Sequence, residues 1–556
     1  MSRLTVKSIF TAGKLGLFDR FVGAFNPGSL VRRGQNRLAD IYINQHLKRN
    51  AYKSSEINRL NEHWTSSNEE INSILYRELD KMRARSRWLL RNNPHAMGMM
   101  NAYISHIIAT GLTLQCRVAK MVRSTDPDGN HIVETVEMDA WNDYAEAKFN
   151  EWAESADARS TELLPESFID DQELFLRRLI EDGEVFVYLG VDTSIPGVPL
   201  RLMFIEPDSL DLSVTKSHGN PVTLGVELDQ RTYRPLAYHV LQGTTEAGPY
   251  DGPGKSLRIP ASNMLHVFKR LRPKQVRGIP HLAVVMQKFF DLDEWTDAEL
   301  LGNKIAACFS VLIEMPNADV PAPGLKPEDE GKATDVNGNP LATVEPGIVG
   351  YMPEGAKATV LAPQKPGSTF DMFTKYLLKS IGAGTLGGIS YPAMTRDTSG
   401  QTFAGGRLSQ NMDFQSFRPF QEFVGRKFCT PVYRCWLAIA VLDGTVIAPG
   451  YFDNPKFWEA SEFMPPGWVS GINPEQDVGA AISRMSSGLS TLADESALLG
   501  RDWKNQMRLM KRIKETADRF GLVLKGVNEI PETLAIEAGA SLPTPAQAEL
   551  NAEKNQ

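Results

Sequence analysis

Residues 83–96 read Arg-Ala-Arg-Ser-Arg-Trp-Leu-Leu-Arg-Asn-Asn-Pro-His-Ala, a basic stretch that runs into a proline. Upstream, apolar residues recur at three- and four-residue spacings, which predicts a long helix over 56–91. Pro94 disfavours helical backbone at the residue before it, so this helix is expected to stop at Asn92 or Asn93. A second helix is expected from about His95 to Ala109, closed by Gly111.

The end of the first helix is densely basic, and two interpretations of it stay open. It could bind phosphates, or it could be a solvated face or an inter-subunit salt-bridge surface that faces the acidic block at 137–184. That block holds fifteen Asp and Glu against four Lys and Arg, so charge is segregated along the chain. The basic residues are Arg77, Lys81, Arg83, Arg85, Arg87 and Arg91.

The composition is that of a globular protein and excludes wholesale disorder. The chain has 556 residues, 42% hydrophobic and 23% charged, with a formal net charge of −7. That charge argues against coating nucleic acid by bulk positive charge.

Four scattered cysteines predict reduced, buried thiols and a cytoplasmic origin. Every long uncharged stretch is diluted by polar groups, so no membrane-spanning helix is expected. Residues 1–26 could pass for a transit peptide but lack a continuous apolar region and a small-residue cleavage site, so a basic arm that docks on a neighbour is the preferred interpretation.

Hydrophobic patterning beyond the first two helices predicts an α+β chain. The acidic block reads as two amphipathic helices, and alternation over 184–268 predicts short antiparallel strands. Pro280 is expected to open a helix to about Phe309, followed by a Pro- and Gly-rich β module. A helix capped by Ser368 or Thr369 comes next, then a loop. A long helix over 403–428 is expected to kink at Pro419, and 474–520 returns to helix.

No string in the chain makes a convincing catalytic, metal or cofactor site. Residues 382–387 match G-x-G-x-x-G, but a dinucleotide loop needs a preceding strand and a following helix, and here a helix precedes. A hinge or a helix C-cap is therefore the preferred interpretation. The nine histidines lack metal-ligand spacing, and Asp291 and Asp293 point apart on a helix. We expect no enzyme, no metal and no cofactor.

Several strings, in chain order, resemble the lambda-type phage portal proteins, the head–tail connectors of tailed phages. Residues 83–96 resemble the family block R-x-R-S-R-x-L-x-R-N-N-P-x-A, and residues 111–115 match the stretch that follows it. Residues 266–280, 292–307 and 431–437 resemble later family blocks. Two family strings differ: G-I-P-Y-E is Gly-Ile-Ser-Tyr-Pro at 388–392, and N-Y-S-S-A-R is replaced at 401–407.

The resemblance implies a ring-forming α+β portal fold with its parts in a fixed order. These would be a basic N-terminal arm (1–55), a wing (56–279), a first stem helix (280–309), a clip (310–367), a second stem helix (368–387), a tunnel loop (388–402), a long kinked helix (403–429), a wing return (430–473), crown helices (474–530) and a disordered tail (531–556).

The resemblance also implies a function, that of a homododecameric ring at one capsid vertex through which double-stranded DNA is packaged and ejected. Implied partners are the terminase large subunit, head-completion adaptors, and the major capsid and scaffold proteins. The ring would assemble in the host cytoplasm and reside in the virion, without membrane contact. The lumen candidates are Lys375, Lys379 and Arg396; the terminase and adaptor candidates lie around Asn337, Asn339 and Tyr351 of the clip.

Two other function classes compete with this interpretation. The chain could be a different minor capsid or tail structural protein, or a nucleotide-dependent enzyme that uses residues 382–387. For a conduit, many Lys and Arg contacts to phosphate would be harmful, because each adds affinity through counterion release. An acidic lumen with sparse basic rings would repel the strand and still centre it.

Overall fold

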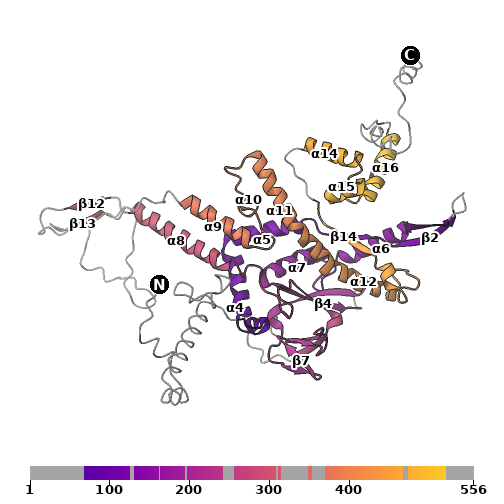
Figure 1. Cartoon of the computed structure of the whole chain (residues 1–556), viewed down its shortest axis with the longest axis horizontal. Helices are drawn as coiled ribbons and strands as arrows, with labels where there is room; N and C mark the ends of the chain where they lie inside the picture. The colour runs from indigo at the N-terminus through magenta and orange to yellow at the C-terminus, as the bar shows by residue number, and fades with distance from the viewer. Residues whose placement is uncertain are drawn as a thin grey trace, which may run out of the picture. The chain divides into compact units, whose positions relative to one another are not determined.

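The computed structural model describes residues 68–125, 131–161, 163–193, 197–241, 256–308, 311–314, 349–352, 370–467, 474–520 and 522. Side chains are described within these ranges except at 122–134, 305–314 and 349–352. The chain divides into two compact units, Met1–Glu69 and Glu70–Gln556, and every helix and strand named below belongs to the second (Figure 1).

Two helices, α4 (Ile71–Asn92) and α5 (Pro94–Ile107), meet at Asn93, which confirms the predicted stop before the proline. The Asn93 side chain caps α5 by accepting a hydrogen bond from the Ala96 amide at 2.8 Å. Its amide also donates to Asp293 at 2.8 Å, so the corner is fixed to a later helix. The predicted helix over 56–91 is wrong at residues 68–70, which are not helical; Glu70 has extended backbone and α4 begins only at Ile71. The predicted part before residue 68 lies outside the described residues.

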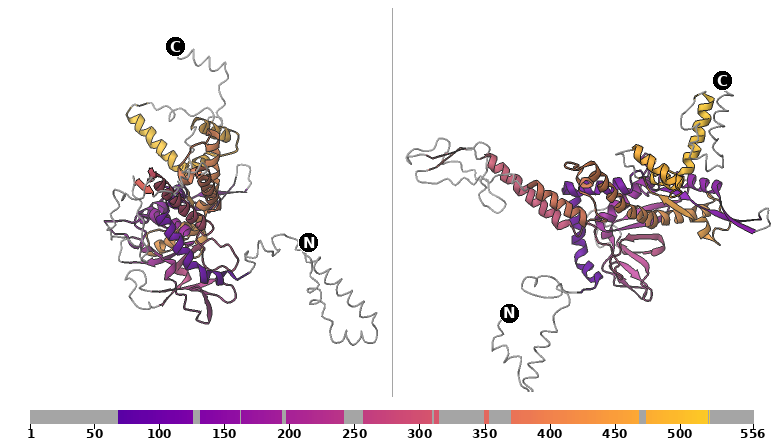
Figure 2. Two further views of the ribbon diagram at one scale, coloured as in Figure 1. Left: turned by 90° about the vertical axis from the view of Figure 1, so that its left-hand side faces the viewer. Right: turned by 45° about the horizontal axis from the view of Figure 1, so that its top comes forward.

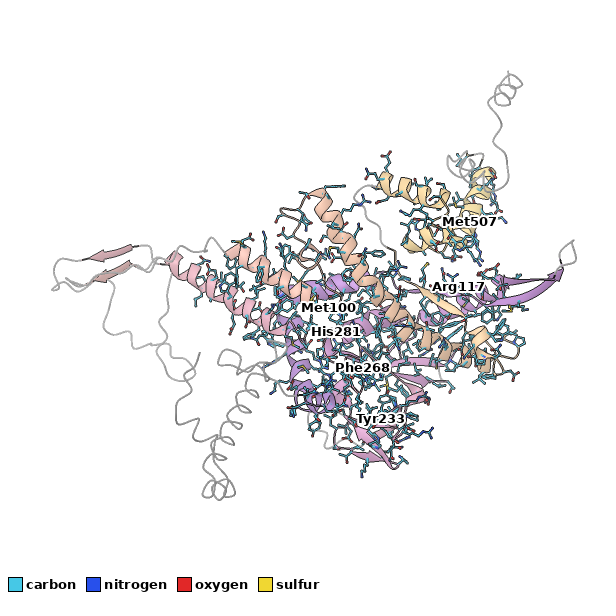
Figure 3. All side chains as sticks on the ribbon, viewed as in Figure 1. Met100, Arg117, Tyr233, Phe268, His281 and Met507 are labelled. Atoms are coloured by element: carbon cyan, nitrogen blue, oxygen red, sulfur yellow. The ribbon has the colours of Figure 1, made fainter. Side chains whose placement is uncertain are left out.

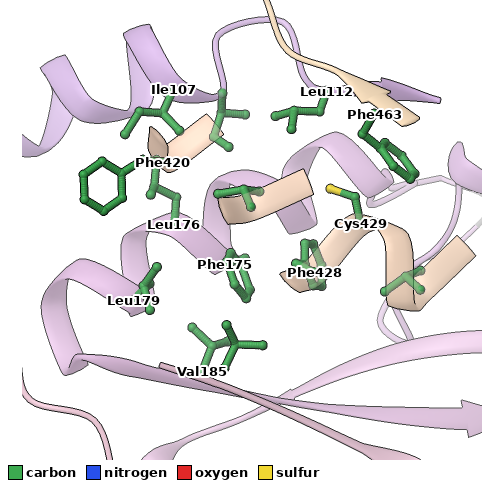
Figure 4. Packing of buried hydrophobic residues seen from close by; sticks show 14 of the residues in the cluster. Ile107, Leu112, Phe175, Leu176, Leu179, Val185, Phe420, Phe428, Cys429 and Phe463 are labelled. Atoms are coloured by element: carbon green, nitrogen blue, oxygen red, sulfur yellow. The ribbon is translucent and has the colours of Figure 1, made fainter. Parts of the chain in front are cut away.

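The acidic block forms two helices, as predicted: α6 (Asp139–Ala153) and α7 (Phe168–Asp182). Ser167 and Asp170 form a capping box at the start of α7. The buried face of α7 enters the main hydrophobic core, where Phe175 stacks on Phe428 with ring centroids 4.4 Å apart (Figure 4). Most of the charged residues of the block therefore lie on two helices that each bury one face in the core.

The region after α7 consists of short antiparallel strands, as the alternating pattern predicted. A three-stranded sheet has the order β11-β4-β5, and a five-stranded sheet has the order β10-β9-β8-β7-β6. Two further antiparallel pairs are β1 with β14 and β2 with β3. The bounds are β1 Thr113–Cys116, β2 Ala119–Thr125, β3 His131–Glu137, β4 Glu184–Val191, β5 Leu200–Ile205, β6 Lys216–Ser217, β7 Asn220–Thr223, β8 Val226–Leu228, β9 Pro235–Leu241, β10 Ser256–Pro260, β11 Met264–Phe268 and β14 Ser461–Met464.

The helix expected from Pro280 begins later, as α8 (Met286–Cys308). Residues 281–285 form turns instead, because the His281 amide donates to the Ile180 carbonyl at the end of α7, 3.1 Å away. His281 is labelled in Figure 3. Tertiary contact with α7 therefore overrides the local helix signal. A 23-residue helix spans about 35 Å, less than the roughly 45 Å expected from 30 residues.

Helix α8 packs beside α9 (Phe370–Gly384), and Figure 2 shows the two together. Trp295 of α8 stacks on Phe370 with centroids 4.8 Å apart, and Lys288 donates to the Ser380 hydroxyl. Between the two helices, the expected β module is described only at β12 (Val311–Glu314) and β13 (Val349–Met352), a parallel pair. The rest of that module lies outside the described residues.

The segment expected as an irregular loop over 388–402 contains a short helix, α10 (Tyr391–Thr395). Ser390 caps it and Pro392 sits in its first turn, which are both helix-start signals. The long helix α11 (Phe403–Val424) carries Pro419 in its interior.

The chain stays helical beyond residue 429, into the Trp- and Pro-rich segment that the resemblance assigns to the wing return. A π-helical turn over 425–429 leads into α12 (Thr430–Asp443). Pro431 has no amide to donate, and the wider turn before it lets the helix pass through. The remaining helices are α13 Pro455–Trp458, α14 Pro474–Ser486, α15 Leu492–Leu498 and α16 Trp503–Arg519.

Asp171 of α7 and Asp157, which precedes that helix, are buried against one another with 2% and 3% exposure. Burial, followed by the charge of Asp157, raises the pKa of Asp171 to about 9. The folded protein therefore holds a proton here that the unfolded chain releases above its ordinary pKa near 3.8. This group's contribution to stability is complete in acid and falls as the pH rises from about 4 towards 9.

We predict that Asp171→Asn raises the melting temperature at pH 8 by at least about 2 °C and that the gain shrinks towards pH 4. The amide removes the need to hold that proton. Differential scanning fluorimetry across this range measures it. Asp170→Asn, which weakens the exposed capping box one residue earlier, should lower the melting temperature at pH 8. A loss of stability in the Asp171 variant at pH 8 would contradict the assignment.

Candidate functional site

The basic end of α4 divides into an inward and an outward face. Arg83 is 2% exposed and forms ion pairs with Glu184 and, at 3.0 Å, with Asp208. Arg87 pairs with Asp182 at 2.7 Å, with Glu206 at 3.0 Å and with Asp208 at 2.5 Å. The exposed members are Arg77, Lys81, Arg85 and Arg91.

The salt-bridge interpretation is therefore correct for the two inward arginines, and phosphate binding is not available to them. Their partners lie in the same chain, although the sequence suggested a surface between subunits. Asp182 and Glu184 come from the acidic block itself, so folding neutralises part of the charge segregation that the sequence shows.

Glu184 is the centre of this cluster and is fully buried. Its carboxylate accepts hydrogen bonds from Arg277 Nε at 2.8 and 3.0 Å and from the Gly278 amide at 2.8 Å. His266 Nε2 lies 2.9 Å from it. Burial alone would favour the protonated acid, but the charges of Arg277 and Arg83 and the bond to His266 together bring the pKa of Glu184 well below its usual range. The carboxylate is thus kept ionised in the core.

The glycine-rich string at 382–387 ends a helix and has no dinucleotide-binding geometry. Gly382 and Gly384 lie in the last turn of α9, and no strand precedes them. A Cβ on Gly382 would lie 2.4 Å from the Ile389 carbonyl oxygen, and one on Gly387 would lie 3.0 Å from Ser416. The glycines therefore permit close backbone packing, which agrees with the C-cap interpretation.

Two of the three lumen candidates come together in one depression, the α9 depression. It is lined by Lys375 and Lys379 of α9, by residues between Ser390 and Gln401, and by Ser409 of α11. The lysines are one helical turn apart, so both head groups lie on the same face. Lys379 is exposed. The depression thus lies between α9 and the 388–402 segment. Helix α9 supplies the lysines, and the other elements supply mainly hydroxyl and amide groups.

The α9 depression carries carboxylates as well as lysines. Lys375 Nζ lies 2.9 Å from Asp371, and that hydrogen bond raises the pKa of Lys375. Asp397 accepts from the Ser399 amide and from the Tyr391 hydroxyl, each at 2.8 Å. These bonds lower the pKa of Asp397 to about 2. Positive and negative charges are therefore close to balanced here, which suits weak contact with a polyanion better than tight binding.

Arg396, the third candidate, does not line the α9 depression but borders it. It ends α10 in the left-handed region with φ of 58°, and its amide donates to the Pro392 carbonyl at 2.7 Å. Its side chain is exposed. The charge is thus held at a fixed turn rather than on a free loop.

The root of the 388–402 segment is held in a socket between α5, α9 and α11. Asp413 of α11 accepts from the Ser390 amide at 2.8 Å and from its hydroxyl at 2.5 Å. Tyr103 of α5 donates to the Leu386 carbonyl at 2.9 Å. A Cβ on Gly98 would lie 2.8 Å from the Met394 carbonyl oxygen, so α5 and α10 meet backbone to backbone. Only the part after Arg396 is freely exposed.

The clip candidates, metal sites, membrane helices and cysteines can be checked only where the structure describes the residues concerned. Asn337 and Asn339 lie outside the described residues, and Tyr351 is described only as a backbone position in β13. Among the described residues, no group of three or more His, Cys, Asp and Glu could hold a metal ion. No described helix is long and apolar enough to cross a membrane. Cys116, Cys429 and Cys435 are free thiols, as expected.

Sequence reasoning missed the residues that hold this site in place. Asp413 and Tyr103 were not singled out, because a carboxylate inside a long helix and a tyrosine in an apolar stripe carry no distinctive spacing. Arg277 was part of a family-like string, but its role as a buried counterion depends on Glu184, 93 residues away. No signal in a single sequence connects those two positions.

Comparison with known proteins gives a family match. The family described as "Phage portal protein, lambda family" matches residues 58–421. The "Probable portal protein" of Halomonas phage phiHAP-1 is 27% identical over 327 residues, covering 57% of this chain and 60% of that protein. "Portal protein B" of Escherichia phage lambda is 24% identical over 285 residues, 48% of this chain and 52% of that protein. The chain thus spans between half and three fifths of the length of these relatives.

Solved structures give a weaker likeness. A chain from "Neck of native GTA particle computed with C12 symmetry" is 13% identical with a TM-score of 0.39, covering 76% of this chain and 94% of that one. A chain from the "Virion of native gene transfer agent (GTA) particle" is 12% identical with a TM-score of 0.38, at the same coverage.

We predict that Glu184→Gln lowers the free energy of unfolding by about 3–5 kcal/mol, because it leaves the buried Arg277 guanidinium without a carboxylate partner and removes one of the two partners of Arg83. Chemical denaturation followed by circular dichroism measures this. Glu206→Gln, which removes only a partly exposed partner of Arg87, should cost about 1 kcal/mol or less. Equal effects from the two variants would show that Glu184 is not the centre of the cluster.

We predict that Asp413→Ala speeds trypsin cleavage after Arg396 by about tenfold, because the Ser390 amide and hydroxyl lose a charged acceptor and the socket opens. Mass spectrometry of timed digests measures the rate at that bond. Asp371→Ala, which breaks only the exposed pair with Lys375, serves as the control and should leave the rate unchanged. An unchanged rate in the Asp413 variant would rule out the socket.

Proposed function

The chain belongs to the lambda family of phage portal proteins, and we propose that twelve copies form a ring at one capsid vertex through which double-stranded DNA passes. In this proposal the wing, stem, clip, tunnel-loop and crown segments keep the order given by the resemblance. DNA would enter during packaging and leave during ejection. The protein itself would perform no covalent chemistry.

The observation that carries the proposal for the channel is the α9 depression with its nearly balanced charges. Lys375 and Lys379 in its lining and Arg396 at its border supply three positive charges. Asp397 in its lining and Asp371, which pairs with Lys375 beside it, supply two negative ones. A surface that must let a strand slide needs enough attraction to guide it and too little to hold it. One excess positive charge per copy meets that requirement better than a continuous basic groove.

The net negative charge of the rest of the chain would repel DNA weakly and at short range. The net charge is −7 per chain, so twelve times −7 gives −84 for a ring. Repulsion between exposed charges is screened within about 8–10 Å at physiological ionic strength. DNA at the centre of a wide channel would therefore meet little resistance, whereas DNA that drifts towards the wall would be pushed back.

A rigid socket suits this task. Because Asp413 and Tyr103 fix the root of the 388–402 segment, the exposed tip keeps a defined position as DNA moves past. Arg396, at the start of that tip, would hold its charge at a constant distance from the channel axis.

The partners in this proposal follow from the task. Terminase would dock on the clip during packaging, and head-completion adaptors would replace it there. The major capsid and scaffold proteins would surround the wing during assembly in the host cytoplasm. The ring would remain in the finished virion.

We predict that Lys379→Glu and Arg396→Glu, together, leave ring assembly intact but speed the loss of packaged DNA at least about twofold, because fewer cations remain to contact phosphate. Nuclease protection of packaged DNA measures the loss, and electron microscopy verifies the rings. Lys216→Glu, an exposed charge reversal in β6, is the matched control and should change neither. Failure of the double variant to form rings would place these residues at a subunit contact instead.

A further inference from the structure

The crown helices have almost no hydrophobic core of their own. Within α14, α15 and α16, the buried residues are Glu495, Ser496 and Ala517, of which only Ala517 is apolar. Large apolar side chains stand exposed instead on all three helices. Helices this short are marginal in water unless an apolar face is covered. Among the described residues, the apolar faces of these helices are therefore left exposed.

Helix α16 presents an apolar stripe to the surface. Met507, Met510 and Ile513 recur at three-residue spacing and are 50%, 45% and 39% exposed; Met507 is labelled in Figure 3. Lys511 and Lys514 follow Met507 and Met510 by four residues, so they border the same stripe. The stripe is thus an apolar face with a basic margin.

Helix α14 presents a second and different apolar face. Val478 and Ile482 lie one turn apart and are 59% and 44% exposed. Glu475 precedes Val478 by three residues on the same side, and it too is exposed. This face therefore has an acidic margin, opposite in sign to that of α16.

Within the described residues, ion pairs link α14 and α16 to other elements and leave both apolar faces exposed, and Gly467 packs backbone to backbone on Leu499 and Gly500 after α15. Arg407 of α11 pairs with Asp477 of α14. Lys504 of α16 pairs with Glu137 and Asp139, and Arg508 lies 2.6 Å from Asp143 of α6. Exposed ion pairs of this kind contribute little to stability, so most of the stabilisation of these helices must come from covering the apolar faces.

We propose that the α16 stripe of one copy packs on the α14 face of the next copy around the ring. This inference rests on the proposed ring. A ring closed by rotation is built from head-to-tail contacts, which need two unlike, complementary patches on each chain. The crown supplies such a pair, matched in apolar character and opposite in charge, since Lys511 and Lys514 would face Glu475 across the contact.

The test measures assembly of the full chain by mass photometry. Met510→Asp and Val478→Asp each put a charge into the contact from one side. Each should raise the concentration at which half the chains are in rings by about tenfold. Arg512→Asp is the matched control, because residue 512 lies on the opposite side of α16 from Met510 and its substitution should leave assembly unchanged.

The double variant shows whether the two faces meet. If Met510 and Val478 contact each other across copies, the combined effect should be clearly less than the product of the single effects. Independent effects that multiply would mean that each face meets something else, and would overturn the pairing. Circular dichroism of each variant as a monomer should match the wild type, because both sites are exposed in the single chain.

Hydrogen exchange separates the remaining outcomes. Amides of 474–520 should be protected in rings and exchange at least about tenfold faster in monomers. Equal protection in monomers would mean that the chain covers its own crown, and would overturn the inference. Rings formed as readily by the variants as by the wild type would overturn it and leave the proposed function standing. Failure of the wild type to form rings would overturn both.

Discussion

A fully buried carboxylate, that of Glu184, is the constraint on which the arrangement of the chain depends. A charge removed from water persists only where opposite charges and hydrogen-bond donors surround it. Here they come from Arg83 of α4, from His266 of β11, and from Arg277 and Gly278 in the segment that leads to α8. All of these groups must surround the Glu184 carboxylate at once. This one side chain therefore fixes how α4, β11 and the segment before α8 are placed relative to one another.

Close backbone contact at the same point adds a steric requirement to the electrostatic one. A Cβ on Gly183 would lie 2.1 Å from the Ile279 carbonyl carbon, and a Cβ on Gly278 would lie 2.2 Å from the Gly183 carbonyl oxygen. The backbone at residue 183 and the backbone at residues 278–279 can therefore come this close only because residues 183 and 278 are glycines. The path into α8, and with it the pairing of α8 with α9 through Trp295 and Phe370, starts from this junction.

Local patterns predicted most elements of this fold, and the errors arise where a long-range contact or an unusual helical turn overrides the local pattern. The stop at Asn93, the two helices of the acidic block and the antiparallel strands all follow from spacing, caps and alternation. The late start of α8 depends on a hydrogen bond from His281 to Ile180, and the continuation through Pro431 depends on a π-helical turn. The first depends on a contact about 100 residues away along the chain, and the second depends on a local π-helical turn that the spacing of apolar residues does not indicate.

In the candidate site, too, the sequence pointed to some residues and missed others. Lys375, Lys379 and Arg396 were identified from the sequence because family resemblance gave the order of the parts. Asp413 and Tyr103, which fix the loop, were not, because a buried polar partner is recognisable only from what it contacts. The role of the basic stretch at 83–96 also became clearer, because its two inward arginines, Arg83 and Arg87, pair with carboxylates of the same chain.

The most direct test of this account is an electron cryomicroscopy map of the assembled protein. The account predicts a closed ring in which Lys379 and the segment after Arg396 face the central opening, while Glu184 and its arginines lie inside the protein wall. A map with Lys379 and Arg396 on the outer surface, or with the Arg83 and Arg87 side chains lining the opening, would contradict it.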